Sequence, residues 1–126
     1  MAVLGVGIDL VPASRLGELL SRHGERALRR LFTDSERERA KGYADPSLHL
    51  AARVAAKEAA YKALSGDGRA NGVGWQDLEV CRLEDGRPSL VFHGAAQRCM
   101  TALGATRCHV SLTHAGGVAA AVVILE

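Results

Sequence analysis

Residues 48–64, LHLAARVAAKEAAYKAL, form a long stretch that is rich in alanine and contains neither glycine nor proline. Alanine has the highest helix propensity, so Leu48 to Leu64 is predicted as one helix, which Gly66 ends. At 100° per residue, the alanines after Arg53 fall on one half of this helix and every charged residue falls on the other half. We expect the alanine half to be buried, because small side chains let another element approach closely. We expect the charged half to be exposed or to face a ligand.

Apolar segments before and after this helix are predicted as strands. The first, Val3–Val11, is bounded by Pro12, carries Asp9 as its only charge and is typical of a buried strand. The other strands pair into two hairpins around turn residues. Their predicted bounds are Leu78–Leu83 with Ser89–Phe92, and Cys108–Thr113 with Val118–Leu125.

Shorter helices are predicted between the strands. Ser14 is a typical N-cap for a helix that starts near Arg15 and that Gly24 interrupts. Thr33 and Glu36 have the spacing of a capping box, which predicts a second start. Residues 94–103 form a third short helix. Because helices and strands partly segregate along the chain, we expect an α+β fold with an antiparallel sheet packed against the long central helix.

Length and composition exclude several classes of protein. The 126 residues fit a single domain over residues 1–126. No apolar run approaches the roughly 20 residues that cross a bilayer, and the first residues lack the basic start of a secretory signal. We therefore expect a cytoplasmic protein with no membrane partner. The three cysteines show no CxxC spacing, so we expect buried, reduced thiols and neither a disulfide framework nor a zinc site.

The charged half of the long helix has two interpretations. It is either a solvated face with a Glu58–Lys62 pair four residues apart, or a site for a polyphosphate with a divalent metal. Lys57 and Lys62 favour the second interpretation, because they are two of only three lysines in a chain with thirteen arginines. A compact ammonium group at a defined depth suits a phosphate.

Asp9 and His114 are further candidates for a ligand site. A carboxylate at the end of an apolar strand needs a partner, since an unsatisfied buried charge costs free energy. That partner is either a set of backbone N–H groups or an arginine, or it is Mg²⁺ shared with Glu58, because magnesium takes one or two protein carboxylates. His114 precedes two glycines at a predicted hairpin tip. It is either a surface histidine or a group that approaches a ligand closely.

Six segments in this order resemble the holo-acyl-carrier-protein synthases, the small bacterial 4′-phosphopantetheinyl transferases. They are GVGIDLVPASR (5–15), FTDSE (32–36), AARVAAKEAAYKAL (51–64), WQDLEV (75–80), GRPSL (86–90) and HVSLTH (109–114). They cover nearly the whole chain, and the combination of GIDxxxxxR with AAKEAxxKAL is specific. Val54 departs from the pattern, because the family usually has an aromatic residue there.

The resemblance implies transfer of 4′-phosphopantetheine from coenzyme A to a serine of an apo acyl carrier protein, with 3′,5′-ADP as the other product. Glu58 and Lys62 are then the catalytic residues: Glu58 is the candidate base for the serine, and Lys62 offsets charge on the leaving diphosphate. The implied ligand contacts are Asp9 and Glu58 to magnesium, Lys62 to the pyrophosphate, and Arg53, Lys57 and His114 to the coenzyme.

The resemblance also implies two protein partners. The small members are trimers, so we expect a homotrimer with its sites between subunits, Asp9 and Glu58 coming from one subunit and His114 from the next. Acyl carrier proteins are acidic, and a first helix that ran on through Gly24 would align several arginines as a docking surface. These are Arg15, Arg22, Arg26 and Arg29. The alternative for them is a solvated amphipathic helix.

A different class of function uses the same arginines: a small basic domain without catalysis that binds nucleic acid. The aromatic content of 4% leaves little for base stacking, and the net charge of +2 is low for that role. We therefore expect no nucleic-acid partner. A degenerate member that binds the coenzyme without turnover is a third possibility, against which the intact Asp9, Glu58 and Lys62 argue.

Overall fold

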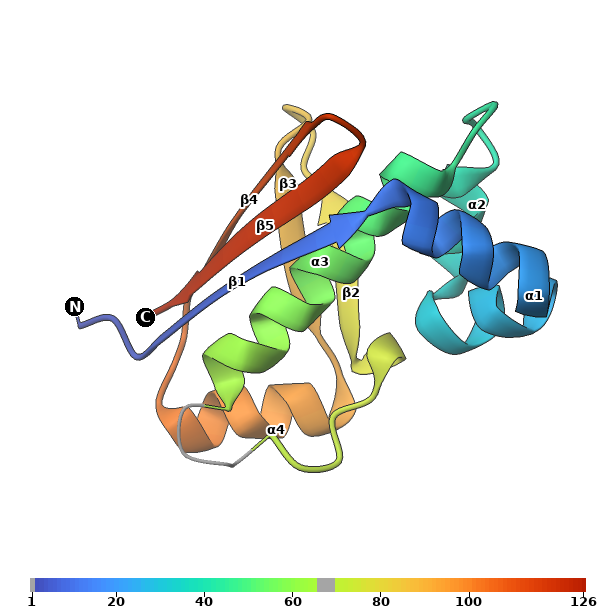
Figure 1. Cartoon of the computed structure of the whole chain (residues 1–126). Helices are drawn as coiled ribbons and strands as arrows, with labels where there is room; N and C mark the ends of the chain where they lie inside the picture. The colour runs from blue at the N-terminus through green and yellow to red at the C-terminus, as the bar shows by residue number, and fades with distance from the viewer. Residues whose placement is uncertain (1, 66–69) are drawn as a thin grey trace.

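The computed structural model describes residues 2–65 and 70–126 and confirms the predicted α+β class (Figure 1). Helices and strands follow one another in the predicted order of strand, helices, hairpin, helix and hairpin. The elements are β1 (Gly5–Pro12), α1 (Ala13–Leu31), α2 (Asp34–Ala40), α3 (Ser47–Leu64), the 3-10 turn η1 (Trp75–Asp77), β2 (Leu78–Arg82), β3 (Pro88–Phe92), α4 (Gly94–Leu103), β4 (Cys108–Ala115) and β5 (Val118–Leu125).

The strands form two antiparallel sheets on either side of α3. Three strands pair in the order β1-β5-β4, and β2 pairs with β3 as a separate hairpin. In Figure 1, α3 runs between the three-stranded sheet and the hairpin, with α1 and α2 at one end of the molecule and α4 at the other. The antiparallel sheet packed against a long central helix is therefore confirmed.

The alanine half of α3 lies against β1, as predicted. Ala55, Ala56, Ala59 and Ala60 are fully buried. A Cβ atom on Gly7 would overlap the carbonyl oxygen of Ala59, and Gly5 meets Ala63 in the same way. Strand and helix therefore touch backbone to backbone, which carries Asp9 directly over α3.

The charged half of α3 is not exposed throughout, because two of its cations are buried. Arg53 is 2% exposed and Lys57 is 0% exposed, and Val54 between them is also buried. The cause is tertiary packing, because the C-terminal end of α1 and the turn η1 both contact Lys57. The outer part of the same half, with Tyr61 and Lys62, is exposed as predicted.

The first strand is buried on one face only, which corrects the prediction of a buried strand. Val6, Ile8 and Leu10 are 59%, 64% and 64% exposed. They lie on the outer face of the β1-β5-β4 sheet, and within residues 2–65 and 70–126 no helix or strand covers that face. The outer face continues across β5 with the residues paired to them in register, Ile124, Val122 and Ala120.

The predicted helix boundaries are partly confirmed. The N-cap at Ser14 is wrong, because α1 begins at Ala13 and Pro12 precedes it without a side-chain cap. Gly24 interrupts α1 as predicted, with φ 50° and ψ −131°. Thr33 and Glu36 form the predicted capping box. Gly66 lies outside the described residues, and α3 ends at Leu64.

The described residues bear on the expectations about membrane helices and about the cysteines. None of the helices there is long and apolar enough to cross a membrane. Of the three cysteines expected to be buried, Cys99 is buried, whereas Cys81 and Cys108 are half-buried.

Candidate active site

Asp9, Glu58 and Lys62 meet where β1 crosses the C-terminal half of α3, and we call these three residues the acidic half-site. The ammonium group of Lys62 donates to Asp9 Oδ1 at 3.2 Å and to the carbonyl oxygen of Ile8 at 3.1 Å. The second carboxylate oxygen of Asp9, Oδ2, is buried and has no hydrogen-bond partner within the described part of the chain. The site thus holds an acceptor that the protein itself leaves unsatisfied.

Glu58 lies close enough to Asp9 for the two carboxylates to influence each other. Burial raises the pKa of Glu58 above its usual value, and the charge of Asp9 raises it further. A hydrogen bond that protonated Glu58 donates to Asp9 acts in the same direction, whereas the charges of Arg15 and Lys62 oppose the rise. Two carboxylates therefore share one small site at a cost in free energy that a cation would relieve.

The donor set of the acidic half-site fits magnesium. Oxygen ligands from one or two carboxylates, completed by phosphates and water, are what Mg²⁺ prefers. Among the described residues, no group of three or more histidine, cysteine, aspartate or glutamate side chains could hold a metal ion, so magnesium here would depend on phosphate and water for its other ligands. The unsatisfied oxygen of Asp9 and the raised pKa of Glu58 are the two observations that make the site a candidate for a hard cation.

A continuous groove borders the acidic half-site. A cavity of about 330 Å³ lies beside Glu58, Tyr61 and Lys62 and reaches Trp75. A second cavity begins at Glu58 and Trp75 and runs along α1. A third adjoins it and shares four lining residues with it. These shared residues are Leu19, His23, Leu31 and Trp75.

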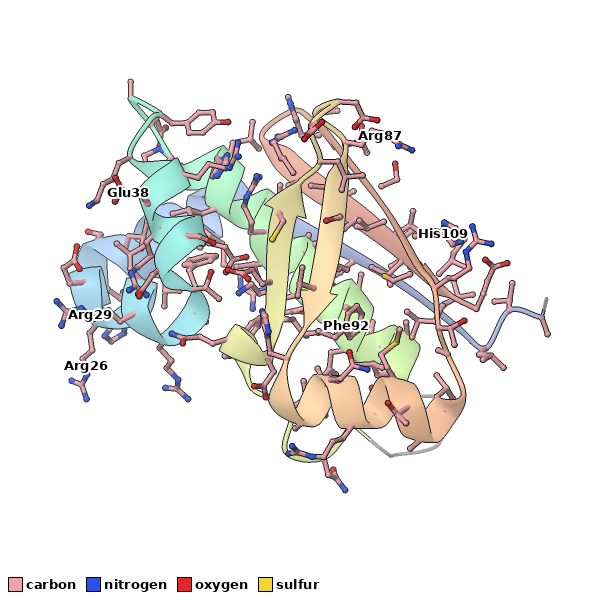
Figure 2. All side chains as sticks on the ribbon, turned by 180° about the vertical axis from the view of Figure 1, so that it is seen from behind. Arg26, Arg29, Glu38, Arg87, Phe92 and His109 are labelled. Atoms are coloured by element: carbon pink, nitrogen blue, oxygen red, sulfur yellow. The ribbon has the colours of Figure 1, made fainter. Side chains whose placement is uncertain are left out.

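The predicted docking arginines border this groove, but they do not form one straight row. Arg15 and Arg22 line its first part, next to Glu58, and Arg26 lines its second part beyond the bend at Gly24. Arg29 is not among the lining residues and forms an exposed ion pair with Glu25. Figure 2 shows Arg26 and Arg29 pointing outward from α1. The bend breaks the helical register, so the basic surface follows a groove and not a stripe.

Arg53 and His114 lie together in a different place, which we call the cationic cavity. It has a volume of about 380 Å³ and is also lined by His49, Arg82 and Tyr43. None of its lining residues borders the cavities beside Glu58. The structure therefore brings the predicted site residues together as two separate groups on one chain.

The cationic cavity carries an excess of positive charge. Within residues 2–65 and 70–126, neither Arg53 nor Arg82 forms an ion pair, and Arg53 Nε and His49 Nε2 are buried without partners. Burial, followed by the charge of Arg82, lowers the pKa of Arg53 to about 10. Burial and the nearby arginines Arg53, Arg82 and Arg39 lower the pKa of His49 to about 4. His49 is therefore neutral near pH 7, and the cavity is suited to an anion.

Lys57 is in neither the acidic half-site nor the cationic cavity, although it lines the cavity of about 330 Å³ beside Glu58. Its ammonium group is buried and donates to the carbonyl oxygens of Leu31 and Trp75, at 2.7 and 3.0 Å, and to Glu36 Oε1 at 2.6 Å. An ammonium group has three protons, so all of its donors are in use. The coenzyme contact predicted for Lys57 finds no free donor here.

Sequence reasoning missed three residues of these sites. His49 precedes Arg53 by four residues on α3, and that spacing places both on one side of a helix, so a search at i and i+4 would have found it. Trp75 is the only tryptophan of the chain. Arg82 has no local signal, because the end of β2 meets α3 only through the tertiary fold.

Known proteins match this chain over nearly its whole length. The model of the 4′-phosphopantetheinyl transferase superfamily matches residues 5–123. A holo-[acyl-carrier-protein] synthase of Koribacter versatilis (strain Ellin345) is 44% identical over 124 residues, 98% of each chain. The structure of holo-[acyl-carrier-protein] synthase from Neisseria meningitidis superposes with a TM-score of 0.88, at 26% identity and over 99% of each chain. A Chronobacterium ammoniagenes ACPS–CoA complex gives a TM-score of 0.85 at 31% identity, over 100% of this chain and 98% of that chain.

Proposed function

Because the chain belongs to the holo-[acyl-carrier-protein] synthases of the 4′-phosphopantetheinyl transferase superfamily, we propose that its acidic half-site and its cationic cavity bind two phosphate-bearing parts of coenzyme A, the diphosphate and the ribose phosphate. The protein is a transferase that moves 4′-phosphopantetheine from coenzyme A to a serine hydroxyl of an apo acyl carrier protein. We take residues 1–126 as one domain, since α3 packs against elements from both halves of the chain. A cytoplasmic location stays a prediction that agrees with both substrates.

The acidic half-site holds the reacting diphosphate. Asp9 and Glu58 are the residues that hold Mg²⁺, and the buried, unpartnered Oδ2 of Asp9 is the observation that carries this assignment. Magnesium supplies positive charge against the diphosphate when it is bound. Lys62 is half exposed, so its ammonium group can turn from Asp9 to the pyrophosphate and offset the charge of the leaving 3′,5′-ADP.

Glu58 is the candidate general base. The serine hydroxyl must lose its proton as the new bond to phosphorus forms, and the bond to 3′,5′-ADP breaks. A carboxylate with a raised pKa is a better proton acceptor than an ordinary one near neutral pH. Positioning and charge neutralisation supply the rest of the catalysis, since phosphoryl-type transfer needs no covalent step on the enzyme.

The cationic cavity holds the other phosphate-bearing end of the coenzyme. Arg53 and His114, which sequence reasoning assigned to coenzyme contacts, are joined there by Arg82 and His49. Lys57 is left out of this assignment because its donors are occupied. Because Arg53 and Arg82 form no ion pair among the described residues, no such pair has to break before they bind a phosphate.

The basic groove along α1 receives the acidic carrier protein. Arg15, Arg22 and Arg26 border it, and its apolar floor leads to Glu58. Charge reversal in Arg22→Glu with Arg26→Glu should weaken use of the carrier protein and its dependence on salt, and leave coenzyme affinity nearly unchanged. Equal effects on both substrates would contradict docking at this groove.

A homotrimer would bring the two half-sites of neighbouring subunits together. The outer face of the β1-β5-β4 sheet exposes Val6, Ile8 and Leu10, and an uncovered apolar sheet face is a surface for protein association. Closed threefold symmetry gives three equal interfaces. Each of them would join the acidic half-site of one subunit to the cationic cavity of the next.

Subunit mixing tests this arrangement. Asp9→Ala and His114→Ala subunits, each weak or inactive alone, should regain activity at about a quarter of the sites when mixed equally, because that share combines two intact contributors. Light scattering that finds a monomer would overturn the trimer. A stable trimer without regained activity would place both residues in one subunit's site.

The transfer assay itself separates this function from nucleic-acid binding. Incubation with coenzyme A, magnesium and an apo acyl carrier protein should add the mass of one phosphopantetheine group to the carrier. Salt-sensitive RNA binding without that transfer would favour the basic binding domain instead.

A further inference from the structure

A buried ion pair between Lys57 and Glu36 joins the parts of the molecule that surround the proposed site. Both side chains are almost completely buried, at 0% and 1% exposure. Glu36 Oε1 accepts from Lys57 and from the backbone N–H of Thr33, and its Oε2 accepts from the backbone N–H of Val80 at 2.9 Å. Through Glu36, Lys57 thereby ties α3 to α2 and to β2.

Lys57 also ties α3 to the groove. Its other two hydrogen bonds reach the carbonyl oxygens of Leu31, the last residue of α1, and of Trp75 in η1. Leu31 and Trp75 are both lining residues of the groove along α1. Gln76 next to Trp75 makes a second connection, because its amide donates to the carbonyl oxygen of Phe32 at 3.2 Å.

Stability alone gives a weak reason for such a pair. Taking two charges out of water costs several kcal/mol each, and well-packed apolar residues of the same volume are often as stabilising as a buried ion pair. The pair does supply a fixed geometry, since the three hydrogen bonds of the Lys57 ammonium group hold three segments in place relative to α3. Glu58 follows Lys57 directly in the sequence, so these segments are fixed relative to Glu58.

We propose that Lys57 and Glu36 are a positioning pair for the transfer: they hold the C-terminal end of α1 and Trp75 at a set distance from Glu58. This inference rests on the proposed docking groove and on the proposed role of Glu58. A carrier protein docked along α1 then presents its serine at the acidic half-site. Misplacement of a reacting group by about 1 Å can lower the rate about 100-fold, so a small shift of α1 is enough.

The test replaces both charges at once. Either single variant leaves a buried charge without its partner, so it destabilises the fold whatever its role. The double variant Glu36→Gln with Lys57→Met removes both charges, keeps the volumes close and leaves an amide oxygen for the N–H of Val80. The matched control is Glu38→Gln with Lys41→Met, an exposed pair at 3.1 Å on the same part of the chain (Glu38 is labelled in Figure 2).

The expected result is a selective loss of turnover. At saturating coenzyme A and carrier protein, kcat per folded molecule should fall about 10- to 100-fold in the double variant. The folded fraction is measured by circular dichroism at the assay temperature. The Kd of coenzyme A, measured by calorimetry with magnesium, should change less than about threefold, because Glu36 is buried away from the cavities and all three donors of Lys57 are in use within the protein. The control variant should match the parent in both quantities.

Two results would overturn the proposal. A parental kcat per folded molecule would make the pair purely structural. A loss of coenzyme affinity of about tenfold or more with kcat retained would make Lys57 a direct contact. Failure of the docking groove is seen separately: if Arg22→Glu leaves use of the carrier protein unchanged while the double variant loses turnover, docking is wrong and the positioning of Trp75 and Glu58 stands.

Discussion

The acidic half-site and the cationic cavity lie on the same helix and carry opposite charge: two neighbouring carboxylates in the first, two neighbouring arginines in the second. Glu58 and Lys62 occupy the C-terminal half of α3, whereas His49 and Arg53 occupy its first half. At 1.5 Å per residue, Arg53 and Lys62 are about 13 Å apart along the axis. The first region has a carboxylate oxygen without a partner, and the second has two arginines that form no ion pair among the described residues, although Asp45 also lines it.

This difference shows what each region lacks. Burial and then the charge of Asp9 raise the pKa of Glu58, and a cation or a proton would relieve the repulsion between the two carboxylates. Burial and then the charge of Arg82 lower the pKa of Arg53, and an anion would relieve the repulsion between the two arginines. Under the proposed function, coenzyme A satisfies both regions, because it carries a diphosphate that a metal ion can accompany and a separate ribose phosphate.

The largest expected effect comes from the acidic half-site. Asp9→Asn and Glu58→Gln should each lower magnesium-dependent kcat at least about 100-fold, because each removes a charge that holds the cation at the reacting diphosphate. Both variants should stay folded, since removing one of two like charges relieves repulsion. Initial rates over a magnesium titration measure the effect. Parental rates at low magnesium would contradict the assignment.

Separating the subunits should lower activity, because the acidic half-site of one subunit would no longer lie beside the cationic cavity of the next. Ile8→Lys places a charge on the outer face of the β1-β5-β4 sheet and should give a monomer with at least about tenfold lower activity. Light scattering and the transfer assay measure the two results. Leu83→Lys is the control, since Leu83 is 46% exposed but lies outside that sheet. A fully active monomer would show that one subunit binds the whole coenzyme.

Variants of the cationic cavity should act on binding and not on turnover. Arg82→Gln should raise the KM for coenzyme A about tenfold with kcat nearly unchanged, because an arginine–phosphate contact is present in the ground state and in the transition state alike. Arg87→Gln, at the exposed tip of the β2–β3 hairpin (Figure 2), is the control. A fall in kcat with an unchanged KM would make the two regions functionally alike.

The smallest effects are on stability, and they have opposite signs in the two regions. The pKa of His49 is lowered from 6.5 to about 4, so protonation favours the unfolded chain. The free energy of unfolding should therefore be retained above pH 6.5 and fall by up to about 3 kcal/mol as the pH drops toward 4. Urea denaturation of the parent and of His49→Phe measures it, and the variant should lose this slope. If the free energy of unfolding changed with pH in the same way in the parent and the variant, His49 would not be a buried neutral histidine.

Glu58 should respond in the other direction. Its raised pKa means that the protonated form favours the folded state, so the metal-free protein should lose stability as the pH rises through that pKa. Glu58→Gln should remove the loss, and added magnesium should reverse it in the parent alone. Thermal unfolding between pH 4 and pH 8, with and without magnesium, measures both effects. A magnesium effect of equal size in the variant would place the cation elsewhere.

Patterns along one element predicted much of this molecule. The alanine spacing of α3 and the Thr33–Glu36 capping box are local, and the structure confirms them. Asp9 and Glu58 were paired as one of two alternatives from their chemistry, and the family resemblance favoured that alternative, because their contact depends on how β1 crosses α3. The burial of Lys57 depends on α1, α2 and η1 folding over it, and no spacing within one helix contains that information.

The backbone contact between β1 and α3 has a consequence for engineering the enzyme. With no side chain between Gly7 and Ala59, the separation of strand and helix is set by main-chain atoms alone. Substitutions elsewhere in the core can alter packing and melting temperature without changing how far Asp9 lies from Glu58. A side chain at Gly5 or Gly7 would instead push the strand away from the helix and separate the carboxylates of Asp9 and Glu58.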